Sequence, residues 1–182
     1  ATQRLSASQE ALKQISTAAE DMNNALITIS GSSNTDTIGT TVMTVQNSLS
    51  TMISMANQSA NGEYLFAGIN TDVQPLAPYD ATSPAKLAFD AAFTTYFTFP
   101  PTDTVGTATI AATGAAPSME DFITNVLEPM YTGADWNTDW SGATDEVMTS
   151  RITQSETVAT SASANANGFR FFALSSVITQ EL

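Results

Sequence analysis

The sequence predicts a mainly α-helical protein that carries a smaller α+β insertion. The chain repeats its apolar positions at helical spacing up to residue 59, all seven prolines and both tryptophans come later, and helical spacing returns near the end. We therefore expect residues 1–71 and 164–182 to form a long antiparallel helical rod of three or more helices with a β-hairpin neck. Residues 72–163 are expected to form an inserted, mixed second domain.

The composition excludes several classes of function. The chain has 182 residues, and five basic against eighteen acidic side chains give a formal net charge of −13. Nucleic acids and anionic lipid surfaces repel such a polyanion, so we expect neither a nucleic-acid nor a membrane partner. Cysteine and histidine do not occur, which excludes zinc fingers, thiolate nucleophiles and Ser-His-Asp triads. No apolar run approaches the ~18 residues that a membrane span requires.

The first two helices are predicted from apolar residues that step by three and four positions, as in a heptad seam. The first seam consists of Leu5, Ser8, Leu12, Ile15, Ala19, Met22, Leu26 and Ile29, with Ser8 as its polar exception. The second seam consists of Ile38, Val42, Val45, Leu49, Met52, Ala56 and Ser59. Residues 30–34 are flexible and polar, and Asp36 or Thr37 is suited to cap the second helix. The two helices are expected to form an antiparallel hairpin.

The carboxyl-terminal part predicts a third helix, which the hairpin needs in order to bury its seam. Phe171, Leu174, Ile178 and Leu182 recur there at helical spacing. Neither the first nor the last helical pattern has a cap at the end of the chain. We therefore expect the chain to be a fragment of a longer protein that lacks both terminal segments.

The neck is predicted where the second seam ends. Asn61 and Gly62 form a strong turn signal, because both residue types tolerate positive φ. Residues 63–67 then alternate as a strand does, and Gly68 with Asn70 ends the run. This stretch predicts a β-hairpin between the rod and the insertion.

The insertion contains its own helix signals. Ser83 followed by Pro84 predicts a helix start, after which Phe89, Phe93 and Phe97 share one face. Ser118 with a carboxylate three residues later predicts a second start, after which Phe122, Val126 and Met130 share a face. Residues 105–113 fit a weak strand or a loop, residues 133–144 a loop, and residues 146–163 one or two strands.

Two groups of acidic residues have a spacing that could suit a chemical site. Asp135, Asn137, Asp139 and Glu146 have the spacing of an EF-hand-like calcium loop, but Trp140 occupies the position where that loop needs glycine. The alternative is a loop anchored by two tryptophans. Asp135 with Asp139, or Asp145 with Glu146, could form the carboxylate pair of a glycosidase, against the alternative of solvated surface acids. We predict no enzyme, no catalytic residue, no cofactor and no metal.

The order of a helical hairpin, the stretch from Asn61 to Gly68, an insertion, and a helix returning through residues 165–170 resembles the bacterial flagellin superfamily. Within it, the core from Tyr64 to Gly68 is most similar to that of the hook-associated proteins at the hook–filament junction. The resemblance covers both outer helical regions and the neck. It implies that a β-hairpin lies at the end of the rod and that Tyr64 and Phe66 hold it on the helices. The structural or interface residues implied are Gly62, Tyr64, Leu65, Phe66, Ala67 and Gly68.

The resemblance also implies a location and partners. The protein would be exported by the flagellar type III system, with an export chaperone, and would act outside the cell as a structural component. The full-length protein would form a homo-oligomeric ring between the hook-side junction protein and flagellin, whereas the fragment would be monomeric. The alternatives are flagellin itself, an extracellular sensor or ligand-binding helical bundle, and a carbohydrate-active enzyme. Met43, Ile53 and Met55 lie off the second seam, which fits either a subunit contact or the third helix.

Overall fold

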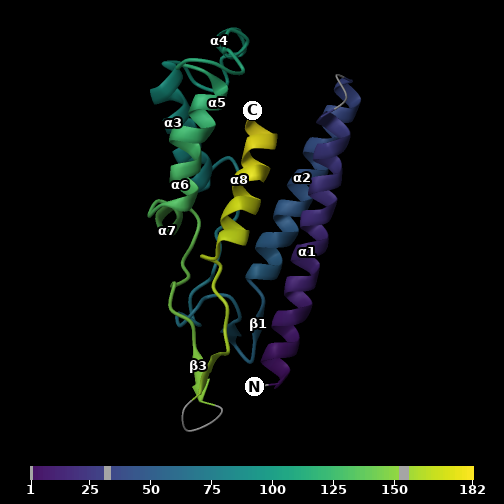
Figure 1. Ribbon diagram of the computed structural model, residues 1–182, viewed down its shortest axis with the longest axis vertical. Coiled ribbons are helices and arrows are strands. Elements are labelled where there is room, and N and C mark those ends of the chain that lie inside the picture. The colour runs from purple at the N-terminus through teal and green to yellow at the C-terminus, as the bar shows by residue number, and fades with distance from the viewer. Residues whose placement is uncertain (1, 31–33, 152–155) are drawn as a thin grey trace.

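The computed structural model describes residues 2–30, 34–151 and 156–182 (Figure 1). The protein is mainly helical, with two small antiparallel β-hairpins. Among the described residues, no helix combines the length and the apolar character needed to cross a lipid bilayer. The elements, in chain order, are α1 (Thr2–Ser30), α2 (Thr35–Ala56), β1 (Ser59–Ala60), β2 (Glu63–Tyr64), α3 (Pro84–Phe97), α4 (Thr104–Thr107), α5 (Met119–Phe122), a π-helical turn (Ile123–Leu127), α6 (Glu128–Thr132), α7 (Trp136–Asp139), β3 (Thr149–Arg151), β4 (Thr157–Ala159) and α8 (Asn167–Glu181).

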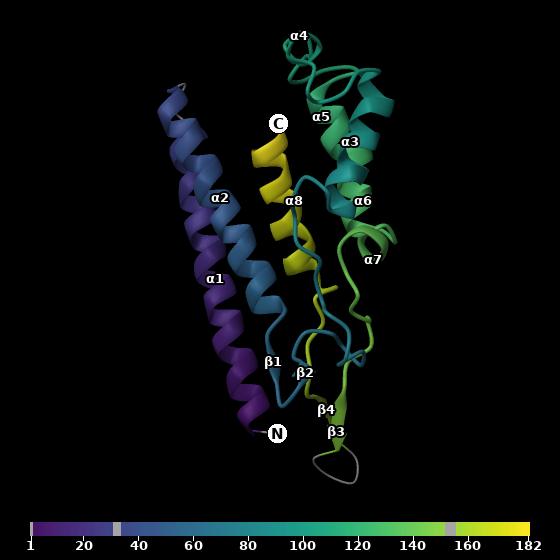
Figure 2. The same cartoon turned by 180° about the vertical axis from the view of Figure 1, so that it is seen from behind.

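Helices α1, α2 and α8 form the long side of the molecule, which confirms the three predicted helices. Helix α2 runs antiparallel to α1 and lies between α1 and α8 in both views (Figures 1 and 2). The cap of α2 differs from the prediction of Asp36 or Thr37. Asn34 is the N-cap, and its side chain accepts a hydrogen bond of 2.8 Å from the backbone N–H of Asp36. The loop predicted at residues 31–33 lies outside the described residues.

The face that α1 buries against α2 differs in part from the predicted seam. Ala11, Ala18 and Met22 are buried, whereas Leu5 and Leu12 are 55% and 44% exposed. A straight helix drifts relative to a strict heptad repeat, so the contact line moves to the position before Leu12. Alanine at the contact also permits a close approach of the two helix axes. The larger leucines are left on the adjoining surface.

The predicted face of α8 is also partly wrong. Phe171 and Leu182 are exposed, although they stand in the predicted repeat. Helix α8 contacts α2 on one side and α6 on another, so its buried surface is wider than one seam. The buried residues of α8 are Phe169, Arg170, Phe172, Ala173, Leu174, Ser176 and Val177.

Helix α3 confirms the predicted start and face. Ser83 is its N-cap, Pro84 is its first residue, and Phe89, Phe93 and Phe97 are all buried. The Phe93 ring meets the Phe122 ring edge-on, with centroids 5.6 Å apart. Such edge-to-face pairs are favourable because the positive ring edge meets the negative ring face. These rings join α3 to α5.

The helix that begins after Ser118 buries a different face from the predicted one. Its capping is as predicted, since the Ser118 hydroxyl accepts a hydrogen bond from the Asp121 N–H at 3.2 Å. In the π-helical turn, backbone hydrogen bonds join residues that are five positions apart instead of four, which moves the buried face by one position. Leu127 and then Tyr131 are therefore the fully buried residues after Phe122, whereas Val126 and Met130 are half-buried and pack against the core.

The remaining segments of the insertion are short elements. Residues 104–107 form a turn of helix, α4, where a weak strand or loop was expected, and residues 136–139 form α7 within the predicted loop. The predicted strands after residue 146 are confirmed as β3 and β4, which pair antiparallel with Ser150 opposite Val158. Residues 152–155 lie outside the described part. The buried apolar side chains of α1, α2, α3 and α8 belong to one continuous cluster.

Candidate functional site

The neck begins with a tight hairpin. Strands β1 and β2 pair Ser59 with Tyr64, and Asn61 and Gly62 turn between them with φ of 55° and 83°. Two consecutive positive φ values match the twist of a two-residue hairpin, which explains the Asn-Gly pair. Arg4 of α1 reaches this hairpin: its Nη1 lies 2.7 Å from Glu63 Oε2, and its Nη2 donates to the Tyr64 carbonyl at 2.9 Å. The first turn of α1 is therefore attached to the neck.

After the hairpin, the chain does not alternate between buried and exposed positions as predicted. The residues from Leu65 to Gly68 are all buried, because other segments cover both sides of this stretch. On one side, the Phe66 carbonyl accepts a hydrogen bond from the Ala164 N–H at 2.7 Å. On the other side, the Ala67 carbonyl accepts one from the Thr144 N–H at 3.1 Å. We call this meeting of residues 65–68, 143–146 and 162–170 the neck joint.

The two aromatic residues of the neck differ in their surroundings. Phe66 is fully buried, and its ring meets the Phe169 ring of α8 edge-on, with centroids 5.8 Å apart. Tyr64 is only partly buried, and its backbone N–H donates to the Thr71 carbonyl at 2.8 Å. Phe66 therefore joins the neck to the helical rod, whereas Tyr64 is partly accessible to solvent.

Gly68 stands where the neck joint has no room for a side chain. Its φ is 67°, and a Cβ atom would overlap the carbonyl oxygens of Thr144 and Glu146 and the hydroxyl of Thr144. We expect Gly68→Ala to lower the free energy of unfolding by about 2 kcal/mol or more, because it adds a backbone clash to the cost of a left-handed alanine.

The matched control for this prediction is Gly62→Ala. Gly62 also has a positive φ, but a Cβ atom there would meet open space. The control substitution should cost only about 1 kcal/mol, which is the strain term alone. Urea unfolding of the two variants, followed by circular dichroism, separates the two terms. Equal losses of stability would show that the close packing around Gly68 is unimportant.

Asn165 connects the neck joint to the two tryptophans. Its side-chain Oδ1 accepts hydrogen bonds from Trp136 Nε1 at 3.0 Å and from the Ser141 hydroxyl at 2.5 Å. Its Nδ2 donates to the Ala143 carbonyl at 3.0 Å and to Asp145 Oδ1 at 2.9 Å. All four hydrogen-bonding positions of this buried amide are therefore used.

Arg170 connects the start of α8 to the end of α6 by hydrogen bonds. This buried side chain donates from Nη1 to the carbonyls of Tyr131, Thr132 and Gly133 at 3.0–3.2 Å, and from Nε to the Asn165 carbonyl at 2.7 Å. The carbonyls at a helix end carry partial negative charge, so they stabilise a buried cation. The guanidinium also lies 5.6 Å from the centroid of the Trp136 ring.

The residues of the calcium alternative do not form a loop. Asp139 and its neighbours belong to α7, where Asp135 and Asp139 are one helical turn apart and Asn137 is not on their side. Within the part of the chain that the structure describes, no three acidic side chains are grouped closely enough to hold a metal ion. Of the proposed glycosidase acids, Asp145 is hydrogen-bonded to Asn165. Asp145 therefore takes part in the hydrogen-bond network around Asn165.

Asp139 leads to a prediction on pH dependence. Burial raises the pKa of its carboxyl, and the negative charge of Asp135 raises it further. The folded protein thus binds a proton on the Asp139 carboxyl more tightly than the unfolded chain does. The stability that this proton contributes is present at low pH and is lost as pH rises through the raised pKa. We expect Asp139→Asn to stabilise the protein at neutral pH and to have no such effect in acid, where Asp139 is already protonated.

Urea unfolding at neutral pH and in acid, where Asp139 is protonated, checks this prediction. Asp72→Asn is the control for the loss of one negative charge, because Asp72 is exposed. A gain in stability for Asp139→Asn that is as large in acid as at neutral pH would contradict the interpretation.

Sequence reasoning placed the neck residues correctly in the chain but missed their partners. The roles of Trp136, Ser141 and Asp145 depend on contacts with Asn165 across twenty or more positions. Arg170 did leave a signal, because it is the only basic residue after Arg151 and stands among the apolar residues of a helix. A lone cation on an apolar face is rarely buried unless it has partners.

The neck joint holds chain segments together through backbone hydrogen bonds and through the side chains of Thr144, Ser163 and Asn165. Comparison with family models, curated proteins and solved structures finds no match for this chain.

Proposed function

We propose that this chain is a structural component of the bacterial flagellum, which connects hook to filament by the packing of subunits. The neck joint is the observation that supports this proposal most strongly. Residues 65–68 resemble the corresponding stretch of hook-associated proteins, and they are buried between two distant segments and α8. A long antiparallel helical rod with a β-hairpin neck and a mixed second domain, joined firmly in this way, suits a protein that transmits force.

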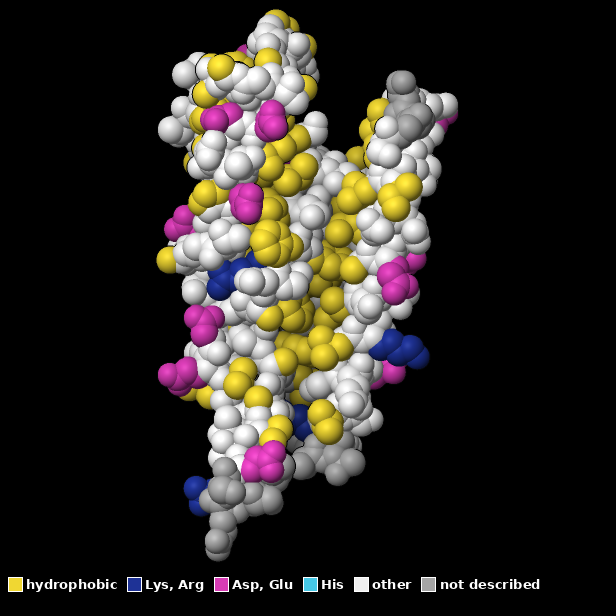
Figure 3. Space-filling view, viewed as in Figure 1, with side chains coloured by type: hydrophobic (Ala, Val, Ile, Leu, Met, Phe, Trp, Pro, Cys, Tyr) yellow, Lys and Arg dark blue, Asp and Glu magenta, His cyan; other side chains and the backbone are white. Residues whose placement is uncertain are grey.

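The surface of the helical rod also supports packing between subunits. Apolar side chains gather in a band between α1 and α8 on the face seen in Figure 3. Leu5 and Leu12 of α1 and Phe171 of α8 are large apolar residues that remain exposed. Exposed apolar surface of this extent is typical of protein contacts. In the full-length protein we expect a homo-oligomeric ring that contacts the hook-side junction protein and flagellin, after export with a chaperone to the outside of the cell.

Immunogold electron microscopy can test the proposal on intact cells of the bacterium that encodes the chain. An antibody raised against these 182 residues should label a single narrow band where the hook meets the filament. Labelling along the whole filament would instead identify flagellin. Labelling over the cell envelope would favour an extracellular sensor, and cells without any flagellar label would contradict the proposal.

A further inference from the structure

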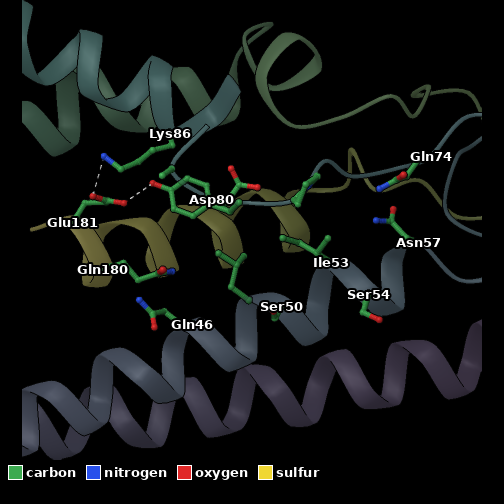
Figure 4. Close-up of a pocket in the computed structure, with 14 residues that line it drawn as sticks. Gln46, Ser50, Ile53, Ser54, Asn57, Gln74, Asp80, Lys86, Gln180 and Glu181 are labelled. Carbon is green, nitrogen blue, oxygen red and sulfur yellow. Dashed lines mark hydrogen bonds and ion pairs between the residues drawn. The ribbon is translucent and has the colours of Figure 1, made fainter. Parts of the chain in front are cut away.

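A cleft of about 590 Å³ separates α2 from the insertion. One wall is a face of α2 that includes Gln46, Ser50 and Ile53. The other wall is the segment from Gln74 to Ala81 together with Lys86 of α3, and the last turn of α8 closes one end (Figure 4). At the opposite end, the Asn57 amide pairs with the backbone N–H and carbonyl of Leu76 at 2.9 and 2.8 Å. The volume is within the usual range for small-molecule sites.

The cleft contains polar side chains that the protein itself does not use. Within the described residues, the side chains of Gln46, Ser50, Ser54 and Gln180 make no hydrogen bond. The Gln180 Nε2 atom is buried and still lacks an acceptor. Figure 4 shows the Gln46 and Gln180 amides close to each other at the same end of the cleft. Buried donors without a protein partner are rare in folded proteins, so this amide is available to a ligand that enters the cleft.

The charges around the cleft disfavour an anionic ligand. Lys86 is its only cation, and it forms an ion pair with Asp90 and lies 3.4 Å from Glu181 Oε2. Glu181 Oε1 also accepts a hydrogen bond from the Tyr79 hydroxyl at 2.9 Å. Asp80 adds a further carboxylate to the lining. Two acids therefore neutralise the lysine, and a negatively charged ligand would be repelled.

We propose that this cleft binds a neutral oligosaccharide. Saccharide hydroxyls both donate and accept hydrogen bonds, so they match the unpaired amides and serine hydroxyls. Their C–H faces match the apolar part of the lining, which includes Leu49, Ile53 and Pro78. The Tyr79 ring in the opposite wall is held by stacking on Trp140, with centroids 5.3 Å apart. The inference goes beyond the flagellar proposal and does not depend on it.

The test is calorimetric titration of the full chain with three neutral probes, maltotriose, cellotriose and chitotriose, and with the anionic probe trigalacturonate. At least one neutral trisaccharide should bind saturably, and trigalacturonate should bind more weakly. Gln46→Leu should weaken the binding of that trisaccharide about tenfold, because one hydrogen-bonding group is lost. Ser50→Trp, which fills the cleft from an exposed position on α2, should abolish binding.

The matched control is Asn47→Leu. Asn47 follows Gln46 in the chain but lines the surface between α2 and α1. Its substitution should leave the affinity unchanged. The proposal is overturned if no neutral saccharide binds, either free in solution or immobilised on a glycan array. It is also overturned if trigalacturonate binds most tightly, or if Asn47→Leu weakens binding as much as Gln46→Leu. Circular dichroism must show that each variant is folded.

An array of immobilised neutral glycans distinguishes the two sources of such a ligand. Binding to free trisaccharides that Ser50→Trp removes supports a soluble saccharide. Binding to array glycans alone, again removed by Ser50→Trp, supports a glycan attached to a surface or a protein. Array binding that Ser50→Trp leaves intact would overturn the assignment of the cleft. Neither result affects the position of the gold label, so this proposal and the flagellar one can fail separately.

Discussion

Replacing Arg170 with alanine is expected to lower the free energy of unfolding by about 3–5 kcal/mol, because four carbonyls lose a charged donor at once. The carbonyls of Tyr131, Thr132 and Gly133 end a helical segment, and water cannot easily replace the guanidinium at this buried position. Urea unfolding followed by tryptophan fluorescence measures the loss. Trp136 is a direct probe, since its ring contacts the guanidinium.

Two variants make this result specific. Arg151→Ala removes the same charge from an exposed position on β3 and should change stability by only about 0.5 kcal/mol. Arg170→Lys keeps the charge, but an ammonium group lacks the planar fork of N–H donors with which the guanidinium reaches four carbonyls. This variant should therefore recover only part of the loss. If Arg170→Ala were no worse than Arg151→Ala, Arg170 would not hold the end of α6.

Replacing Phe66 with alanine should cost about 3–5 kcal/mol, because it opens a cavity in a fully buried site. For a chain of this length, the melting temperature should fall by about 10 °C. The contact of Phe66 with Phe169 is also the apolar link between the neck and α8. Thermal unfolding followed by circular dichroism provides the measurement.

Phe171→Ala is the matched control for Phe66→Ala. It removes the same kind of side chain, but Phe171 of α8 is 44% exposed, so the loss should be about 1 kcal/mol or less. An unchanged melting temperature for Phe66→Ala would contradict its place in the core. Phe171→Ala has a second use, since a residue that contacts another subunit should affect assembly more than stability.

Much of the fold could be predicted from local signals. The spacing of apolar residues predicts the three long helices, Ser83 with Pro84 predicts the start of α3, and Asn61 with Gly62 predicts the hairpin. These signals succeed because each depends on the backbone preference of a few consecutive residues.

The errors arise where a distant segment or an irregular helical turn decides which side chain is buried. Leu12 was assigned to the seam, although the contact with α2 uses Ala11. Val126 was assigned to a buried face that the π-helical turn gives to Leu127. The partners of the Asn165 side chain lie twenty or more positions away, and no local pattern contains them. Local periodicity therefore predicts the elements but not which of their side chains meet.

The hydrogen bonds of the neck joint also determine when the protein can fold. Residues 65–68 precede their partners at 162–165 by nearly a hundred positions, and the first of these bonds joins Phe66 to Ala164. A chain that enters a new compartment with its amino terminus first can form the α1–α2 hairpin early, because that contact is local. The neck can close only after residues 162–164 have arrived. The joint thus makes the arrival of this distant segment the event that fixes the neck on the rest of the fold.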